Sequence, residues 1–354
     1  MAKILYLGND HPSTTSSHRA NALRRLGHVV KVFDIDEMIG NLTLSRYLEP
    51  LHFRTGYSFL QNRVTKWTKK VVENNRGADL IWVNSGDKLG PRSMRELKKI
   101  GVPIVLYNND DPTGGRDGGR FNSLIKALPY YDLCAVMRET NVDEFKSKGA
   151  KNVMRVWMSY DEILHKPYTS HADIPHDFKT DIVFIGTWMR HEKRDEFLLE
   201  LIRGGLGLSI YGDRWKKSTH FKELQPYYKG KSLSGSNYVA AIQGAKICLG
   251  LLSKGNRDLH TQRSLEVPFA GGLLCAERTS EHLDLYEEGK DAVFWSDAKE
   301  CIKVCRWLID KDSHRKKIVY NGMQRVRSNK VGNEDVCEQI LKEVESLKTN
   351  VVLR

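Results

Sequence analysis

The feature that most constrains this chain is an alternation of apolar runs and helix-like stretches that occurs twice. In the first half, runs that are apolar along their whole length are separated by amphipathic helical stretches. Such strands are typical of a parallel sheet covered by helices on both faces. We therefore predict a doubly wound α/β architecture for this half. The runs cover residues 3–8, 29–34, 78–84, 102–108 and 131–137.

A break separates the two halves. Residues 167–180 contain two prolines and no periodicity, and are predicted to be a linker. The alternation then restarts, and a helical stretch covers about residues 298–347. We therefore predict two Rossmann-like domains, residues 1–166 and 181–330, and a C-terminal helix within residues 331–354. The apolar runs of the second half are residues 181–186, 206–212, 245–252, 272–277 and 291–296.

Length and composition are compatible with two soluble domains. The 354 residues are ample for two cores, and 40% apolar with 28% charged residues is ordinary for a globular protein. No apolar run reaches the length of a membrane span, so a cytoplasmic protein is expected. The six cysteines are scattered without a CxxC pair, so we expect reduced, buried thiols and no zinc or other metal site.

The net charge of +12 suits nucleic acid, anionic lipid or phosphate-bearing small molecules, or only a basic surface. No recognition helix or aromatic RNA-binding sheet is evident, so nucleic acid is not the expected partner. The segment Arg46–Arg76 mixes aromatic and basic residues. It fits peripheral contact with an anionic membrane or a lipid-linked acceptor, or a pair of amphipathic helices packed on the sheet.

The segment Arg257–Gly272 joins polar residues to a small, apolar end. We predict that a helix begins between Thr261 and Leu265, with Thr261 or Ser264 as its cap and Pro268 near its first turn or at a kink. A helix N-terminus suits a diphosphate. Arg263 and Glu266 share one helix face, so they offer a cation for phosphate beside a carboxylate for sugar hydroxyls. The alternative is a surface salt bridge between them.

Several segments resemble the GT-B fold glycosyltransferases, in particular the group similar to the spore-maturation protein CgeB. They include "DIVFIGTWMRHEKR", "LSIYGDRW", "AKICLGLL" and "TQRSLEVPFAGGLLCAERTSEHLDLYEEGKDAVFW". The resemblance implies two facing Rossmann-like domains and a final helix that packs back on the first. It also implies transfer of a sugar from a nucleotide-sugar donor to a glycan, lipid-linked or protein acceptor in polysaccharide biosynthesis, with no metal or other cofactor.

The resemblance also implies roles for residues of the second half. Glu266 would hold the ribose of the donor, and Asp258 would meet the donor sugar in a D-x7-E pattern that favours retention. Basic residues after the strand at 181–186 would reach the diphosphate, unless they form only a solvated helix face. The predicted donor-binding residues are Gly186, Arg190, Arg194, Gly212, His260, Thr261, Arg263 and Glu266.

The first half is the acceptor half by the same resemblance. Asp10 or His11 would act as the base in an inverting enzyme, and with Asp258 they are the predicted catalytic residues. The predicted acceptor-side residues are Asn9, Asp87, Asp110 and Asp111. Asp110 and Asp111 precede Pro112 in the acceptor half, so we do not expect them to bind metal. The alternatives are a nucleic-acid or nucleotide-binding protein without transferase activity, or a nucleotide-sugar hydrolase or epimerase on the same fold.

Overall fold

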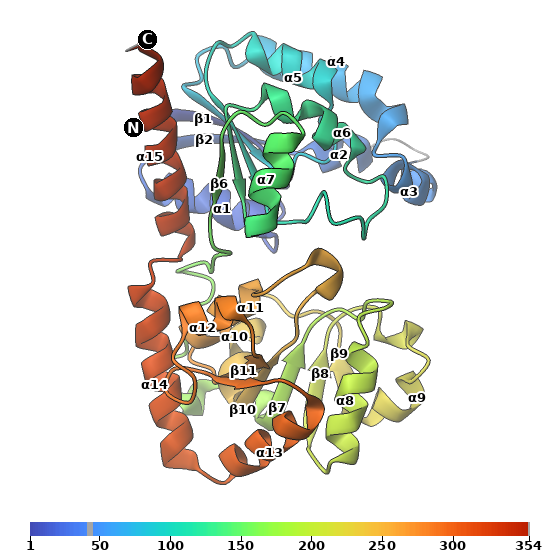
Figure 1. The fold of residues 1–354 in the computed structure, drawn as a ribbon, viewed down its shortest axis with the longest axis vertical. Helices are drawn as coiled ribbons and strands as arrows, with labels where there is room; N and C mark the ends of the chain where they lie inside the picture. The colour runs from blue at the N-terminus through green and yellow to red at the C-terminus, as the bar shows by residue number, and fades with distance from the viewer. Residues whose placement is uncertain (41–44, 353–354) are drawn as a thin grey trace. The chain divides into compact units, whose positions relative to one another are not determined.

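The computed structural model describes residues 1–40 and 45–352 and divides into two compact units (Figure 1). Unit 1 comprises Met1–Trp157 together with Asn333–Arg354, and unit 2 comprises Met158–Gly332. Each unit is built around one six-stranded sheet in which all paired strands are parallel. The predicted α/β architecture with two Rossmann-like sheets is confirmed.

Unit 1 has the strand order β2-β1-β3-β4-β5-β6. The strands are β1 (Lys3–Leu7), β2 (Val29–Phe33), β3 (Leu80–Asn84), β4 (Ile104–Asn108), β5 (Leu133–Val136) and β6 (Val153–Arg155). The helices are α1 (Thr15–Arg25), α2 (Ile35–Gly40), α3 (Ser45–Arg54), α4 (Gln61–Glu73), α5 (Pro91–Lys98), α6 (Asn122–Ala127), α7 (Glu139–Ser147) and α15 (Asn333–Val352).

The two faces of the unit 1 sheet are covered differently. One face packs aliphatic side chains against α4, α5, α6 and α7. The other carries stacked aromatic rings, with Trp82 between Tyr6 and Tyr107 on the neighbouring strands. The buried guanidinium of Arg19, on α1, lies 3.5 Å from the Tyr107 ring centroid and donates to Asn84 Oδ1 at 2.7 Å. Cation–π contact thus fastens α1 to this face.

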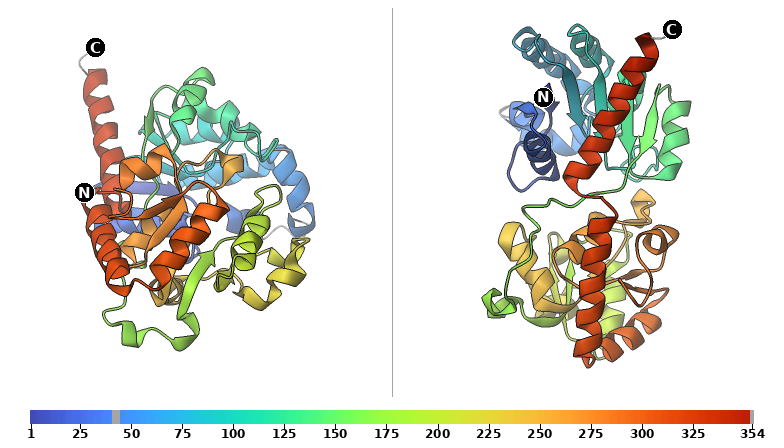
Figure 2. Two further views of the ribbon diagram at one scale, coloured as in Figure 1. Left: turned by 60° about the horizontal axis from the view of Figure 1, so that its bottom comes forward. Right: turned by 90° about the vertical axis from the view of Figure 1, so that its left-hand side faces the viewer.

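Helix α15 completes unit 1 from the far end of the sequence. It packs on α1, where Arg25 forms an ion pair with Glu334, and its side chains Val336, Cys337 and Ile340 are buried. The right-hand view of Figure 2 shows α15, in dark red, running beside the strands of unit 1. Unit 1 is therefore assembled from both ends of the described chain.

Unit 2 has the strand order β12-β11-β10-β7-β8-β9. The strands are β7 (Thr180–Ile185), β8 (Leu208–Tyr211), β9 (Tyr228–Gly230), β10 (Ala245–Gly250), β11 (Leu274–Glu277) and β12 (Val293–Trp295). The helices are α8 (Arg194–Arg203), α9 (Phe221–Leu224), α10 (Gly235–Gly244), α11 (Gln262–Phe269), α12 (Ser280–Leu285), α13 (Ala298–Ile309) and α14 (Asp312–Ser328).

Alternate strand residues of unit 2 face opposite layers. One set packs with α8 and α13 in a large apolar core. On the other face, α10 and α11 pack on β10, and α11 also contacts α14.

Residues 167–180, the predicted linker, lie within unit 2. There the Tyr168 backbone exchanges two hydrogen bonds with the Gln243 side chain, and Ile174 is buried.

The short edge strands β6 and β9 were not predicted, because their sequences VMR and YKG are only partly apolar and do not stand out as buried runs. In the segment Arg46–Arg76, α4 buries Val64, Val71 and Val72 in the core and exposes Arg63 and Lys66. The amphipathic packing that we weighed for this segment is therefore present.

Among the described residues, no helix combines the length and the apolar character needed to cross a bilayer.

The strands β7 and β8 are joined at their carboxyl ends by a close contact between two glycines. A Cβ placed on Gly212, whose φ is +143°, would lie 2.1 Å from the Gly186 carbonyl oxygen. The same carbonyl accepts a 2.8 Å hydrogen bond from the indole of Trp215, which is buried against Phe184. Gly212 thus permits approach of the protein's own backbone, where the sequence had suggested approach of a nucleotide.

We predict that Gly212→Ala destabilises unit 2 by at least about 2 kcal/mol, because the added Cβ collides with backbone and the φ is strained for alanine. Chemical denaturation followed by tryptophan fluorescence measures the change. The control is Gly207→Ala, since a Cβ at Gly207 meets nothing within 4 Å. Equal stability of the two variants would show that the contact between the glycines is not required.

Candidate functional site

Two loops at the carboxyl edge of the unit 2 sheet are fastened to each other. Arg194, the first residue of α8, donates to Thr187 O at 2.8 Å and to Leu252 O at 3.0 Å. It therefore ties the loop after β7 to the loop after β10. The predicted donor ligand Arg194 is engaged within the protein, and its position makes it an organiser of this edge.

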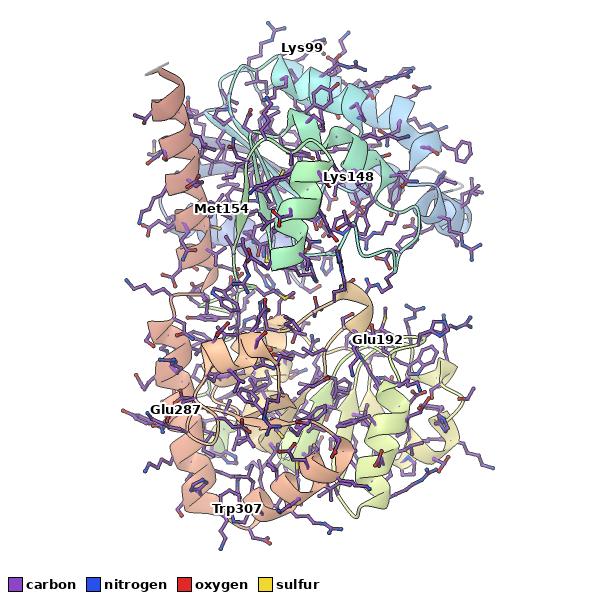
Figure 3. All side chains as sticks on the ribbon, viewed as in Figure 1. Lys99, Lys148, Met154, Glu192, Glu287 and Trp307 are labelled. Atoms are coloured by element: carbon purple, nitrogen blue, oxygen red, sulfur yellow. The ribbon has the colours of Figure 1, made fainter. Side chains whose placement is uncertain are left out.

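Glu192 also joins the same two loops. Its carboxylate accepts from the backbone N–H of Lys254 at 2.9 Å, from that of Gly255 at 3.2 Å and from the Ser253 hydroxyl at 3.1 Å (Glu192 is labelled in Figure 3). Consecutive N–H groups that point at one anion form a favourable electrostatic contact. The loop that leads into α11 is thereby held against the loop that follows β7.

Helix α11 begins where predicted, with Thr261 as its N-cap. The Thr261 N–H donates to Ser264 Oγ at 3.0 Å. Pro268 lies in the last turn, although the sequence suggested the first turn or a kink. Because Pro268 has no N–H, the carbonyl of Ser264 loses its helical donor. The buried hydroxyl of Tyr286 replaces it with a 2.7 Å hydrogen bond.

A second chain of hydrogen bonds holds the start of α11. Ser264 Oγ lies 2.7 Å from His282 Nε2, and His282 Nδ1 lies 2.6 Å from the Glu277 carbonyl. A carbonyl only accepts, so Nδ1 carries the proton and Nε2 accepts from the serine hydroxyl. Burial lowers the pKa of His282 to about 4, which keeps the ring neutral. This series of hydrogen bonds therefore requires neutral His282 with its proton on Nδ1.

The Glu266 carboxylate is buried on α11 and is engaged by partners from outside the helix. The Tyr238 hydroxyl donates to Glu266 Oε2 at 2.5 Å, and His165 Nε2 lies 3.7 Å from Oε1. Burial raises the pKa of Tyr238 well above its ordinary value; the charge of Glu266 adds to the rise and that of Arg263 opposes it. Tyr238 therefore stays protonated and fixes the orientation of the carboxylate.

Arg263 lies half-buried in the first turn of α11. Its Nε is buried without a hydrogen-bond partner, and within the described ranges Arg263 forms no ion pair. The alternative of a surface salt bridge with Glu266 is therefore wrong for the structure described. Several other arginines also have a buried Nε without a hydrogen-bond partner, but Arg263 differs in lying at the N-terminus of α11, where an anionic ligand would satisfy it. Beside it, the first N–H groups of a helix have no partner within the helix.

The other predicted donor residues have different surroundings. His260 is buried, with Met158 N–H donating to Nε2 at 3.1 Å and Glu281 accepting at 2.5 Å from Nδ1. Both ring nitrogens are used within unit 2, so His260 positions the chain. Asp258 is buried in the loop before α11, and Arg190 is exposed in the loop after β7.

In unit 1, the loop after β1 is bonded to the loop after β2. The Asn9 side chain donates to Asp36 Oδ2 at 3.2 Å, and the Asp10 N–H donates to Asp34 Oδ2 at 3.0 Å. The Asp10 side chain is exposed, and so is the ring of His11, whose Nδ1 lies 2.8 Å from Ser13 Oγ. Neither is held by a buried partner.

The acidic residues after β3 and β4 gather around Arg120. Its guanidinium lies 3.3 Å from Asp87, 3.2 Å from Asp110 and 3.2 Å from Asp117. Burial raises the pKa of Asp110, although Arg120 opposes the rise. Asp111 is separate from this group and accepts from the Asn141 amide at 2.8 Å. Two of the three predicted aspartates are therefore brought together.

Several neighbours of the site residues were missed from the sequence. Tyr238 and His165 are 28 and 101 positions from Glu266, so no local motif connects them. Arg120 lies in the glycine-rich "GGRDGGR", whose charge was visible but whose partners were not. Only the proximity of strand ends in a parallel sheet could have suggested these contacts.

The chain is similar to known proteins in its second half and in its fold. Residues 190–342 match the family model described as "Glycosyl transferase-like". Comparison with curated proteins gives no match. Among solved structures, HepE of Anabaena in complex with UDP and glucose is 14% identical over 98% of this chain and 100% of that one, with a TM-score of 0.66.

Two further solved structures are similar to this chain over nearly its whole length. Sucrose-phosphate synthase from Thermosynechococcus elongatus is 12% identical over 99% of this chain and 100% of that one, with a TM-score of 0.69. A proposed UDP-N-acetylglucosamine 2-epimerase from Listeria monocytogenes is 10% identical over 99% of this chain and 97% of that one, with a TM-score of 0.63. The chain thus has the GT-B fold and carries a glycosyltransferase-like domain.

We predict that Tyr286→Phe lowers the free energy of unfolding by about 1–3 kcal/mol, because it leaves the buried Ser264 carbonyl without a donor. Differential scanning calorimetry compares it with Tyr320→Phe, a change at an exposed position. If both variants melt like the wild type, the hydroxyl does not compensate for Pro268.

We predict a pH dependence that originates at His282. Its pKa of about 4 in the folded chain lies below the ordinary value of about 6.5, so the unfolded chain takes up the proton first as the pH falls. The stability that the neutral His282 contributes, about 3 kcal/mol, is fully present above about pH 6.5 and is lost as the pH falls towards 4. Denaturant unfolding should show that the wild type and His282→Gln differ less in free energy of unfolding as the pH falls from 6.5 to 4.

The matched control for this measurement is His176→Gln, at an exposed position of unit 2. Its stability should follow that of the wild type at every pH. A constant gap between wild type and His282→Gln would contradict the assignment.

Proposed function

We propose that this chain, a glycosyltransferase-like protein of the GT-B fold, transfers a sugar from a nucleoside-diphosphate donor to an acceptor. The observation that carries the proposal is the pair on α11: a guanidinium with a buried, unpartnered Nε, three residues before a buried, oriented carboxylate. Both lie on the helix that follows the carboxyl end of β10, the region where nucleotides bind in α/β sheets. The match over residues 190–342 includes this helix.

The chemistry of the proposed donor site follows from these groups. Arg263 and the N-terminal amides of α11 would bind the diphosphate and stabilise the charge that develops on it as a leaving group. Glu266 would accept from ribose hydroxyls, since each carboxylate oxygen has a second lone pair beyond its present contact. The cation and the helix dipole supply the positive charge, so we propose transfer without a metal at this site.

The donor sugar would lie towards Asp258, and we propose retention of configuration with Asp258 as the residue that meets the sugar. Asp10 and His11 are exposed and would take part only in an inverting reaction. Unit 1 would hold the acceptor through the group formed by Asp87, Asp110 and Arg120. These carboxylates are suited to hydroxyl-rich acceptors, because an ionised carboxylate only accepts hydrogen bonds.

A polysaccharide, lipid-linked or protein acceptor, the CgeB-like subgroup and a cytoplasmic location remain predictions from the sequence. So does peripheral contact with an anionic membrane. The basic residues Arg63 and Lys66 and the apolar side chain of Phe59 are exposed and are compatible with such contact. The apolar face of α4 is already used by the core.

A nucleotide-sugar epimerase or hydrolase is the second candidate, because the chain also shares its fold with the proposed epimerase from Listeria monocytogenes. The two differ in what they require. An epimerase or hydrolase converts the donor without an acceptor, whereas a transferase consumes it in step with acceptor glycosylation. Chromatography of the nucleotide sugar after incubation without acceptor separates the candidates.

We predict that one of UDP, GDP, ADP, dTDP and CMP raises the melting temperature, because a ligand that binds only the folded state stabilises it. Arg263→Ala and Glu266→Gln should each weaken that nucleotide about tenfold to hundredfold, as expected for a lost charge-assisted hydrogen bond. Thermal shift and calorimetric titration measure both effects.

The matched control is Arg95→Ala, at an exposed position of unit 1, which should bind like the wild type. Two results would refute the donor site: no stabilisation by any of the five nucleotides, or unchanged affinity in Arg263→Ala. The anomeric configuration of the product, read by NMR, then tests retention.

A further inference from the structure

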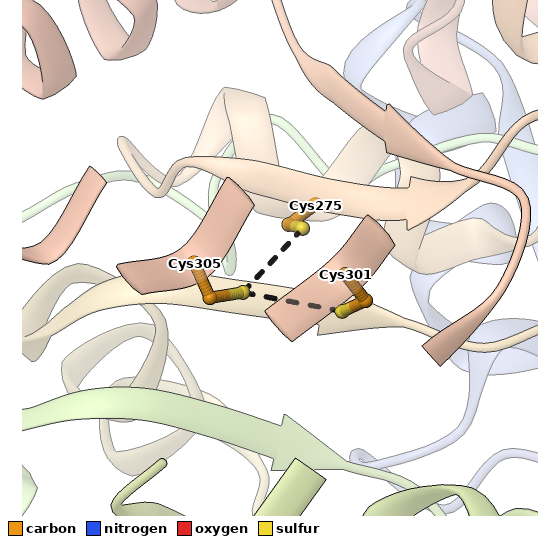
Figure 4. A group of neighbouring side chains, drawn as sticks. All are labelled: Cys275, Cys301 and Cys305. Atoms are coloured by element: carbon orange, nitrogen blue, oxygen red, sulfur yellow. Dashed lines mark hydrogen bonds between the residues drawn. The ribbon is translucent and has the colours of Figure 1, made fainter. Parts of the chain in front are cut away.

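Three of the six cysteines meet in the core of unit 2, although they are scattered in the sequence. Cys275 lies on β11, and Cys301 and Cys305 lie one turn apart on α13. The sulfur of Cys305 is 4.0 Å from that of Cys275 and 4.0 Å from that of Cys301, and all three sulfurs lie within 4.8 Å of one another (Figure 4). All three residues are fully buried.

The sulfur separations match those around a three-coordinate cation. A disulfide needs sulfurs about 2.05 Å apart, far less than is seen here. Thiolates bind soft metals at about 2.3 Å, so three thiolates in one plane around a cation lie about 4.0 Å from each other. The two separations of 4.0 Å agree with that value, and the third pair of sulfurs lies within 4.8 Å.

The ligand set selects the class of cation. Thiolates favour soft ions such as Cu(I) and Zn²⁺. Structural zinc sites are almost always four-coordinate. Among the described residues, the group of metal-binding side chains here contains three members and no fourth. Three sulfurs without a fourth ligand therefore fit Cu(I) better than zinc.

The surroundings of the sulfurs are apolar. Leu198, Leu249, Val293 and Leu308 belong to the same core cluster, together with Trp295. A bound cation would offset part of the cost of holding thiolates in such a core.

We propose that Cys275, Cys301 and Cys305 bind one soft cation of the Cu(I) class, which clamps α13 to β11. Three metal–sulfur bonds form and the three thiols release three protons to solvent. No electron is transferred, and the complex with one Cu(I) ion keeps two negative charges. The site is separate from the donor-binding residues on α11 and does not depend on the proposed transferase activity. Its role is to stabilise unit 2.

The test uses the full-length, fully reduced protein under anaerobic conditions, with Cu(I) supplied as its coloured bicinchoninate complex. Because the sulfurs are buried, loading is done both on the folded protein and during refolding from denaturant. We expect the wild type to take up one equivalent and to melt at a higher temperature when loaded. Cys305→Ala should take up none at the same chelator concentration.

The matched control is Cys248→Ala, a buried cysteine on β10 outside the cluster, which should take up one equivalent. Circular dichroism checks that both variants fold. If Cys305→Ala does not fold, X-ray absorption of the loaded wild type decides, and three sulfur ligands are expected. The proposal is overturned by no uptake in the wild type, by equal uptake in Cys305→Ala, or by a ligand number other than three.

Discussion

The hydrogen bond from Tyr286 to the Ser264 carbonyl is the contact on which the proposed donor site depends. Pro268 removes one donor from a helix of eight residues, and such a short helix has few other bonds to hold its shape. The tyrosine restores the missing bond from outside, and the neutral His282 holds the hydroxyl of the same serine. Arg263 and Glu266 are therefore presented by a helix that is fixed through both the carbonyl and the hydroxyl of Ser264, which lies between them.

This arrangement explains why the two donor-side groups differ in their burial and in their hydrogen bonding. Glu266 is buried and oriented by Tyr238, whereas Arg263 keeps a nitrogen without a partner. A preorganised carboxylate loses little freedom when it accepts from a ligand. In unit 1, by contrast, Asp87 and Asp110 both pair with the guanidinium of Arg120. The two edges therefore present different groups to a ligand.

The sequence predicted what repeats along the chain and missed what depends on distant partners. Alternating apolar runs were enough for two parallel sheets, and Thr261 was a visible N-cap because capping is local. Gly212 was read as a place for a ligand, but its closest contact is the Gly186 backbone on a neighbouring strand end. His260 was predicted to bind the donor, yet both ring nitrogens have partners elsewhere in the chain, Met158 and Glu281. The cysteine group was missed for the same reason: an i, i+4 pair on α13 meets Cys275 only through the packing of a helix on a strand.

The composition of unit 1 from both ends of the chain has a consequence for how the protein is made. During synthesis the six strands of unit 1 emerge before unit 2, but the face carrying α1 still lacks α15, which is translated after unit 2. Domains generally fold in the order in which they leave the ribosome. Here the first domain to emerge is the last that can be completed, and until then the partners of Val336, Cys337 and Ile340 stay uncovered. The nascent chain therefore spends the whole translation of unit 2 with an open apolar surface, and such surfaces make incompletely folded chains prone to aggregate.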